Sequence, residues 1–209
     1  SMQTYPVSGI WIYDDSDNHV DLREVEPYKQ IFSMLTQKGI GWQVTYGNGT
    51  GQVSGHKLSL RECKSEYLWR VDDDELPEPT CLENLMRVMA SDSNIGACGG
   101  LVLDVANQGA SQVASNKIED IYLGLNEQWF RNPGSKTHEV DHLYGTFVYK
   151  RGKDYYPSNL SRIGHREETI ATYRMKRAGL KLFIEPMAIT WHLKGNWGGI
   201  RDGVKEMWD

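Results

Sequence analysis

The sequence has few cysteines and no long hydrophobic run. Its three cysteines, Cys63, Cys81 and Cys98, lie in apolar segments outside any Cys-x-x-Cys or zinc-ligand spacing. This pattern favours reduced, buried thiols and a cytoplasmic location over a disulfide framework. The longest apolar runs, such as LKLFIEP at 180–186, are far shorter than the ~20 residues that cross a bilayer. The sequence therefore predicts no membrane-spanning helix.

An excess of positive charge is also absent. The 23 Lys and Arg residues are outnumbered by 28 Asp and Glu residues, which gives a formal net charge of −5. Acids and bases are interspersed, so there is no basic stripe and binding to duplex nucleic acid is not expected. Aromatic residues are plentiful instead. Seven Trp and eleven Tyr suit stacking on flat faces such as sugar rings or bases.

Strand-like runs alternate with amphipathic helical patterns through the first half of the chain. Strands are predicted at 7–13, 41–46, 67–71 and 95–103, and helices at about 25–39, with Gly39 as the expected stop, and at 82–89. One aromatic helix candidate, IEDIYLGLNEQWF, follows at 118–130. Such alternation predicts a single α/β domain with a mostly parallel central sheet. At 209 residues the length gives no reason to divide it. In such domains ligands gather at the carboxyl ends of the strands.

Three consecutive aspartates, Asp72, Asp73 and Asp74, follow the predicted strand YLWRV. A calcium loop starting at Asp72 fails, because its fifth and sixth positions would be Leu76 and Pro77. The pair Asp72 and Asp74 instead suits Mg²⁺ or Mn²⁺ that is also bridged to a diphosphate. The motif alone is short, and a solvated acidic turn is the alternative that it leaves open.

Five segments together resemble the GT-A fold glycosyltransferases of family 2. They are QTYPVSGIWIYDDSDN (3–18), YLWRVDDDELPEP (67–79), HLYGTFVYKR (142–151), GHREETIATYRMKRAGLKLFIEP (164–186) and AITWHLKGNWGGIR (188–201). The resemblance implies one GT-A domain, with a nucleotide-binding half at 1–103 and an acceptor and catalytic half at 104–209. It also implies metal-assisted, inverting hexosyl or deoxyhexosyl transfer from a nucleotide-diphosphate sugar to an acceptor hydroxyl, with Mn²⁺ or Mg²⁺ as cofactor.

The resemblance further implies the donor-binding residues. Either Asp14 or Asp15, with Asp15 favoured, corresponds to the acid that contacts the base or ribose. The remaining nucleotide-sugar candidates are His56, Lys57, Asp72, Asp73, Trp191, Trp197 and Arg201. The metal ligands it implies are Asp72, Asp74 and His192. The glycine-rich segment at 195–203 is expected to fold over the donor, with Arg201 meeting a phosphate.

The catalytic base is expected at Glu168 or Glu167. In an inverting transfer the acceptor hydroxyl must lose its proton, so a carboxylate is needed on the acceptor side. Glu168 corresponds to the family's aspartate base, and it is longer by one methylene. An ordinary acidic helix start is the structural alternative for both glutamates.

The expected partners are a UDP-sugar, with dTDP- or GDP-sugars as alternatives, and a glycan or other hydroxyl acceptor. Two other functions are alternatives: a nucleotidyltransferase, and a non-catalytic sugar- or nucleotide-binding module. A nucleotidyltransferase would require a glycine-rich signature with Arg and Lys after its first strand, and none is present. The family has a strand and helix before QTYP. We therefore expect an open base pocket, weak donor affinity and a possible homo-oligomer through an incomplete sheet edge.

Overall fold

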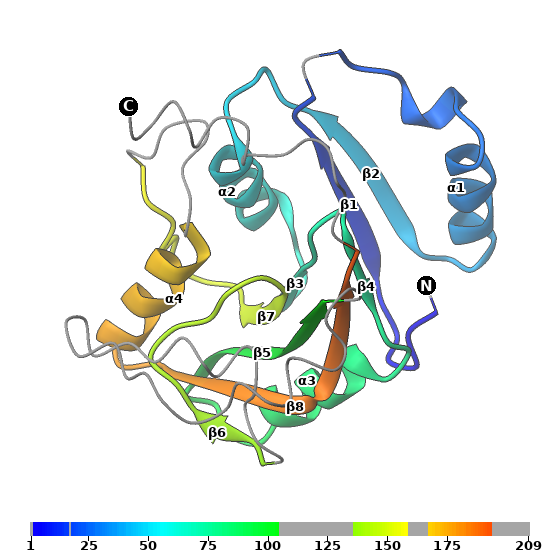
Figure 1. Ribbon diagram of the computed structural model, residues 1–209. Helices are drawn as coiled ribbons and strands as arrows, with labels where there is room; N and C mark the ends of the chain where they lie inside the picture. The colour runs from blue at the N-terminus through cyan, green and yellow to red at the C-terminus, as the bar shows by residue number, and fades with distance from the viewer. Residues whose placement is uncertain (1, 17, 105–135, 159–166, 194–209) are drawn as a thin grey trace.

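Strands and helices alternate along the protein, whose computed structural model describes residues 2–16, 18–104, 136–158 and 167–193 (Figure 1). The elements in chain order are β1 (Gly9–Asp14), the 3₁₀ helix η1 (Leu22–Glu24), α1 (Tyr28–Gln37), β2 (Gly41–Tyr46), α2 (Gln52–Glu62), β3 (Tyr67–Arg70), β4 (Glu75–Pro77), α3 (Cys81–Met89), β5 (Ile95–Asp104), β6 (His138–Glu139), β7 (Phe147–Lys150), α4 (Glu167–Arg177) and β8 (Lys181–His192). The predicted strands and helices of the first half are confirmed, and Gly39, predicted to end α1, adopts a φ of 68°. The predicted aromatic helix at 118–130 lies outside the described residues.

The central sheet is mixed, and the prediction of a mostly parallel sheet was wrong. Its strand order is β3-β7-β5-β8-β4, with β6 pairing with β8, and among the described strands of this sheet only the β5–β8 pair is parallel. Strand β7, from the second half of the chain, enters antiparallel between β3 and β5. The alternation in the first half indicates crossover connections correctly, but it contains no information about a strand inserted from elsewhere.

Two hydrophobic clusters cover the two faces of this sheet. One gathers Leu68, Phe147 and Leu182 with Met175 of α4. The other joins Leu85 and its neighbours on α3 to buried residues of the same strands. Helices α3 and α4 therefore lie on opposite faces (Figure 1). Cys81 and Cys98 are buried and all three cysteines are free, as predicted.

Strands β1 and β2 form a separate parallel pair. Helix α1 packs against it through the buried side chains of Phe32 and Leu35, and the Phe32 ring stacks on Trp42 at 4.3 Å. No residue of β1 or β2 is fully buried. Within the described residues no backbone ladder joins this pair to the six-stranded sheet. Oligomerisation through this edge stays a prediction.

The segment QTYP ties the start of the described chain to the loop before α3. The Gln3 side chain donates to the Glu78 carbonyl at 2.9 Å and accepts from the Leu82 amide at 3.0 Å. The Thr4 amide donates to the Pro79 carbonyl at 2.8 Å. Among the described helices, none is both long and apolar enough to cross a bilayer.

Candidate functional site

The loop between β3 and β4 directs its aspartates to different partners. Asp74 Oδ2 lies 2.9 Å from His192 Nε2, although the two residues are 118 positions apart. Sheet pairing explains this contact, because β4 runs antiparallel to β8 with Glu75 opposite His192. The Leu193 amide also donates to the Asp74 carbonyl at 2.7 Å. Two of the three predicted metal ligands are thus brought together at the carboxyl end of β8.

Asp72, the third predicted ligand, faces a different partner. Its Oδ1 accepts a hydrogen bond from Arg70 Nη2 at 3.1 Å, and the neighbouring Asp73 is exposed. In the parts of the chain that the structure describes, no cluster of three or more His, Cys, Asp or Glu side chains is placed to hold a metal ion. Asp74 and His192 nevertheless supply a carboxylate oxygen and an imidazole nitrogen. This donor pair fits Mn²⁺ when phosphate oxygens and water complete the shell.

Arg70 is the centre of a buried charge cluster beside this loop. Its Nη2 lies 3.2 Å from Glu167 Oε1, and its Nη1 lies 3.5 Å from Glu168 Oε2. The side chains of Arg70, Glu167 and Glu168 are each at most 6% exposed. Both glutamates lie in the first turn of α4, as predicted. The structure thereby places the two candidate bases next to the aspartate loop.

Burial and crowding change the proton affinity of this cluster. Burial raises the pKa of Glu168 to about 7; the Arg70 charge opposes the rise, and the Glu167 charge adds to it. Glu75 behaves similarly, because burial and the nearby Asp72 raise the pKa of its carboxyl to about 8. A carboxylate whose pKa lies near neutrality is suited to general base catalysis.

Helix α2 contributes His56 and Lys57 to the other side of the cluster. The His56 ring stacks on Tyr156 with centroids 4.8 Å apart, and its Nε2 lies 3.7 Å from Glu167 Oε1. Burial and the Arg70 charge lower the pKa of His56 to about 3, so the ring is neutral. Lys57 Nζ donates to Ser158 Oγ at 3.0 Å. Both side chains therefore join α2 to the segment that follows β7.

The carboxylate of Asp15, the favoured nucleotide contact, binds backbone amides of the protein. It accepts hydrogen bonds from the amides of Gly49 at 2.9 Å, Thr50 at 3.2 Å and Gly51 at 2.7 Å. A Cβ added at Gly47 would meet the side chains of Asp15 and Tyr13, so a larger residue there would displace them. Asp15 thus closes the loop between β2 and α2, where the sequence predicted a ligand contact that stays untested.

Asp14 is the half-buried neighbour at the end of β1. It accepts hydrogen bonds from the amide and hydroxyl of Ser16 and lies 3.9 Å from His19. Burial alone would raise the pKa of Asp14, but the bonds from Ser16 outweigh it and the pKa is lowered. Its carboxylate is therefore ionised at neutral pH, as a contact to ribose or base hydroxyl and N–H groups would require.

A shallow cavity of about 340 Å³ lies beside these aspartates. Its lining residues come from the ends of β1 and β2, from the loop after β2 and from α2: Tyr13, Tyr46, Gly47, Asn48, Thr50, Ser54, Lys57, Leu58 and Arg61. Two tyrosine rings and several amide and hydroxyl groups make this lining suitable for a flat, hydrogen-bonding ligand.

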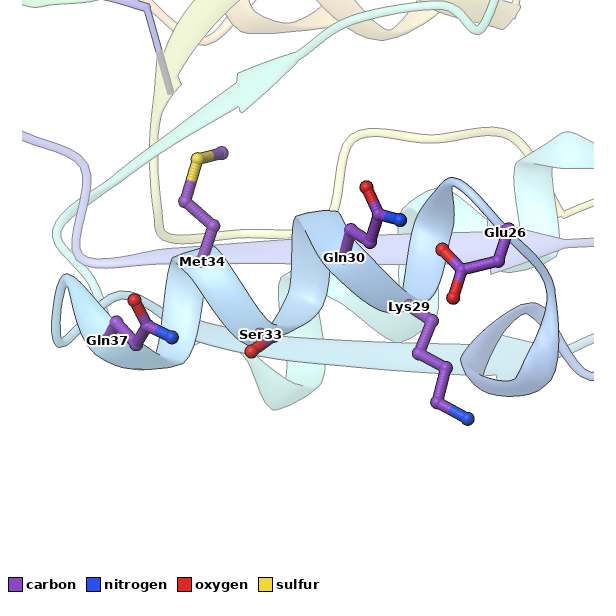
Figure 2. Close-up of a pocket in the computed structure, with 6 residues that line it drawn as sticks. All are labelled: Glu26, Lys29, Gln30, Ser33, Met34 and Gln37. Atoms are coloured by element: carbon purple, nitrogen blue, oxygen red, sulfur yellow. The ribbon is translucent and has the colours of Figure 1, made fainter.

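A second cavity, of about 390 Å³, lies on α1 and on Glu26, two residues before it (Figure 2). Its lining residues are Glu26, Lys29, Gln30, Ser33, Met34 and Gln37. None of them is a predicted site residue, and all except Glu26 belong to α1, with no second element of the described chain lining the cavity. This cavity is therefore not the candidate site.

The remaining predicted contacts come from the end of the chain. Trp191 Nε1 donates to Glu78 Oε1 at 3.1 Å, so its polar edge is used within the fold. Trp197 and Arg201 lie outside the described residues.

Sequence reasoning missed Arg70 and Glu75. A signal for Arg70 was available, because strand alternation places it on the same face as the buried Leu68. An arginine at such a position is rare unless it is paired. Glu75 carried no comparable signal, since an acid directly after three aspartates resembles one more solvated residue.

The chain belongs to glycosyl transferase family 2, whose family model matches residues 2–151. No curated protein matches the chain significantly. Among solved structures, the fold is similar to the crystal structure of GalNAc-T7 with UDP, GalNAc and Mn²⁺, at a TM-score of 0.61 and 17% sequence identity. That match covers 88% of this chain and 37% of the GalNAc-T7 chain. The GT-A fold expected from the sequence motifs is thus confirmed.

Proposed function

We propose that this protein transfers a sugar from a nucleotide-diphosphate donor to an acceptor hydroxyl by a single displacement with inversion. The observation that supports this most directly is the placement of two kinds of acidic group at one end of β3. Asp74 of the loop and His192 at the end of β8 are partly exposed, and Glu168 is buried. The first pair suits a diphosphate-bound cation, and the second group suits a base.

Asp74 and His192 would hold the divalent cation, with Mn²⁺ or Mg²⁺ as candidates. The bound cation would offset the charge that develops on the leaving diphosphate. The Mn²⁺ and UDP in GalNAc-T7 support this assignment by fold similarity alone. We place Asp72 with Arg70 instead of in the metal shell, because its carboxylate already accepts from the guanidinium.

Glu168 acts on the acceptor. Its carboxylate takes the proton of the acceptor hydroxyl while the hydroxyl oxygen bonds to the anomeric carbon and the bond to the diphosphate oxygen breaks. Because burial raises the pKa of Glu168 to about 7, the base is half ionised near neutral pH and can accept a proton readily. Glu167 is more deeply buried and makes the closer contact to Arg70, so we assign the transfer of the proton to Glu168.

The cavity lined by Tyr13, Tyr46 and Lys57 is the proposed base and ribose pocket, and Asp14 directly follows its lining residue Tyr13 at the end of β1. It belongs to the half at 1–103, and the proposed base belongs to the half at 104–209. A UDP-sugar is the favoured donor, dTDP- and GDP-sugars are alternatives, and the acceptor is a glycan or another hydroxyl compound.

The test combines binding with stereochemistry. Melting temperatures are measured with UDP-, dTDP- and GDP-sugars in the presence of Mn²⁺ and again with EDTA, because a ligand of the native state raises the midpoint. An upward shift that EDTA abolishes is expected for one nucleotide class. Proton NMR of the first product then reports the anomeric configuration. Retention would contradict the displacement, and binding without turnover would leave a sugar-nucleotide-binding module.

A further inference from the structure

A single buried side chain connects the two acidic regions. Arg70 is the last residue of β3, and its Nη2 contacts both Asp72 at 3.1 Å and Glu167 at 3.2 Å. Its Nη1 lies 3.5 Å from Glu168. Asp72 belongs to the loop that also carries Asp74, whereas the glutamates belong to α4. The guanidinium therefore bridges the proposed donor side and the proposed acceptor side.

Burying these charged groups costs desolvation free energy, which a purely structural contact would not require. One cation stands among three carboxylates, and replacing buried ion pairs by apolar residues is often neutral or stabilising. The Arg70 guanidinium also lies over the ring of Phe147, with its Cζ 5.9 Å from the ring centroid. Its Nε, although buried, has no hydrogen-bond partner among the described residues. A site that keeps an imperfectly paired charge in its interior indicates a function for that charge.

We propose that Arg70 is a positioning residue for the transfer, holding Glu168 and Glu167 at the start of α4 in register with the aspartate loop. This inference rests on the proposed function, in which Glu168 receives the acceptor proton. Arg70 touches neither donor nor acceptor in this role. It fixes where the receiving carboxylate lies and supplies the positive charge that favours its ionised form.

Arginine suits this role because its planar fork presents several N–H groups in a fixed geometry to separate oxygens. Lysine would keep the charge but present it as a point, without the fork. Among the described residues, which exclude 159–166 just before α4, the titratable groups that interact with Glu168 are Arg70 from β3, Glu167 from α4, His56 from α2 and Tyr156 from the segment after β7. His56 is neutral, so Arg70 is the cation in this set.

The test compares Arg70→Lys and Arg70→Met with wild type across pH. We expect Arg70→Lys to melt close to wild type and bind nucleotide with Mn²⁺ within a few-fold, because Asp74 and His192 are intact. Its kcat should fall roughly 10²-fold, the usual cost of misplacing a reacting group. In Arg70→Met the pH at half-maximal kcat should also rise, because the carboxylate loses its cation.

The matched control is Arg87→Met, which removes an arginine from another buried carboxylate. Arg87 Nη2 lies 3.3 Å from Glu185 Oε2, outside the site. It should leave kcat and its pH midpoint unchanged. A folded Arg70→Lys with wild-type kcat and an unshifted pH midpoint would overturn the inference, as would an equal loss of kcat in Arg87→Met.

A second readout needs no transfer assay. Unfolding free energies of Arg70→Met, Glu168→Gln and the double variant form a cycle. We expect the double variant to be more stable than the sum of the single changes predicts, because Glu168→Gln removes a charge that Arg70→Met leaves uncompensated. Strict additivity would contradict the coupling. If wild type transfers no sugar, the proposed function fails while this cycle still reports on Arg70. If Glu168→Gln abolishes transfer and Arg70→Lys does not, only the inference fails.

Discussion

The aspartate loop and the start of α4 hold acids of the same kind in opposite situations. The side chain of Asp74 is 46% exposed, and its one described partner is His192. Glu167 and Glu168 are almost completely buried and share Arg70. The exposed acid has room for a ligand to complete its shell, whereas the buried acids already have an internal counter-charge. The acids of the aspartate loop therefore have two kinds of positive partner. Asp74 is proposed to bind an external cation, and Asp72 is paired with the internal Arg70.

The difference in burial also changes how strongly the charges of each region interact with their neighbours. Two unit charges 4 Å apart interact by about 1 kcal/mol in water and by about 4 kcal/mol at an effective dielectric constant of 20. Contacts of the buried cluster are therefore held by the protein itself. Contacts of the exposed loop depend on what binds there. The first region should control chemistry and the second should control donor affinity.

The sharpest separation of the two regions is Glu168→Gln. The amide keeps the shape of the side chain but cannot take a proton, so transfer should fall by roughly 10²–10⁴-fold with nucleotide affinity retained. Steady-state transfer and calorimetric titration of UDP with Mn²⁺ measure the two quantities. Glu167→Gln is the comparison, with a smaller expected loss. If it shows the larger loss, the base is Glu167.

Asp74→Ala addresses the exposed region. We expect nucleotide affinity in Mn²⁺ to fall roughly tenfold or more, about 1.4 kcal/mol, while the affinity measured in EDTA stays as it was. Glu66→Ala is the control, because Glu66 is exposed just before β3, at the opposite end of the strand. If the wild type binds nucleotide equally well in Mn²⁺ and in EDTA, Asp74 is not a metal ligand and the proposed difference between the two regions is wrong.

Local sequence pattern predicted much of this fold because strands and helices are encoded by nearby residues. Strand β2 occupies the predicted residues 41–46, and the predicted Gly39 follows α1 two residues after its end at Gln37, with a φ of 68°. The neighbours of each strand are not encoded locally, which is why the insertion of β7 and the resulting mixed sheet were missed. Family membership was predictable from five spaced motifs, and it was confirmed over 2–151.

The site was predictable only where a motif marked it. Asp74 and His192 came from the motifs, and the structure brings them together, although their role as metal ligands stays a prediction. Arg70 could not be found in this way, because its partners Glu167 and Glu168 are nearly a hundred residues away and depend on how α4 packs. Asp15 is the opposite case. It was predicted from a motif as a ligand contact, but in the structure its carboxylate binds backbone amides of the loop after β2.

Asp15→Ala tests whether this third acid behaves as a ligand contact or as part of the fold. Three backbone amides lose their acceptor, so we expect a loss of about 1–2 kcal/mol in unfolding free energy, moderated because the loop is partly exposed. Urea denaturation measures it. Asp73→Ala, an exposed neighbour of the site, should change stability little. If the variant is as stable as wild type but does not bind nucleotide, Asp15 contacts the donor and is not mainly a structural residue.

The smallest expected effect concerns the neutral histidine of the buried region. Because the pKa of His56 is lowered to about 3 from its usual 6.5, the native ring stays neutral while the unfolded chain binds a proton below pH 6.5. Stability is therefore present above pH 6.5 and is lost as the pH falls toward 3, by no more than about 1.4 kcal/mol per pH unit. Glu168 acts in the opposite direction: its raised pKa gives stability that is full below about 4.5 and lost as the pH rises toward 7.

His56→Phe keeps a ring to stack on Tyr156 and removes the titration, while Glu168 is present in both proteins. The difference between the two stability curves thus isolates His56. We expect the curves to run parallel above pH 6.5, where any offset reports packing alone, and the wild-type curve to fall more steeply between pH 6.5 and 4.5. Urea titrations at these values measure the slopes. Parallel curves throughout would mean that His56 takes up its proton in the folded protein, which would add a second cation beside Glu167 and weaken the contrast between the buried and exposed regions.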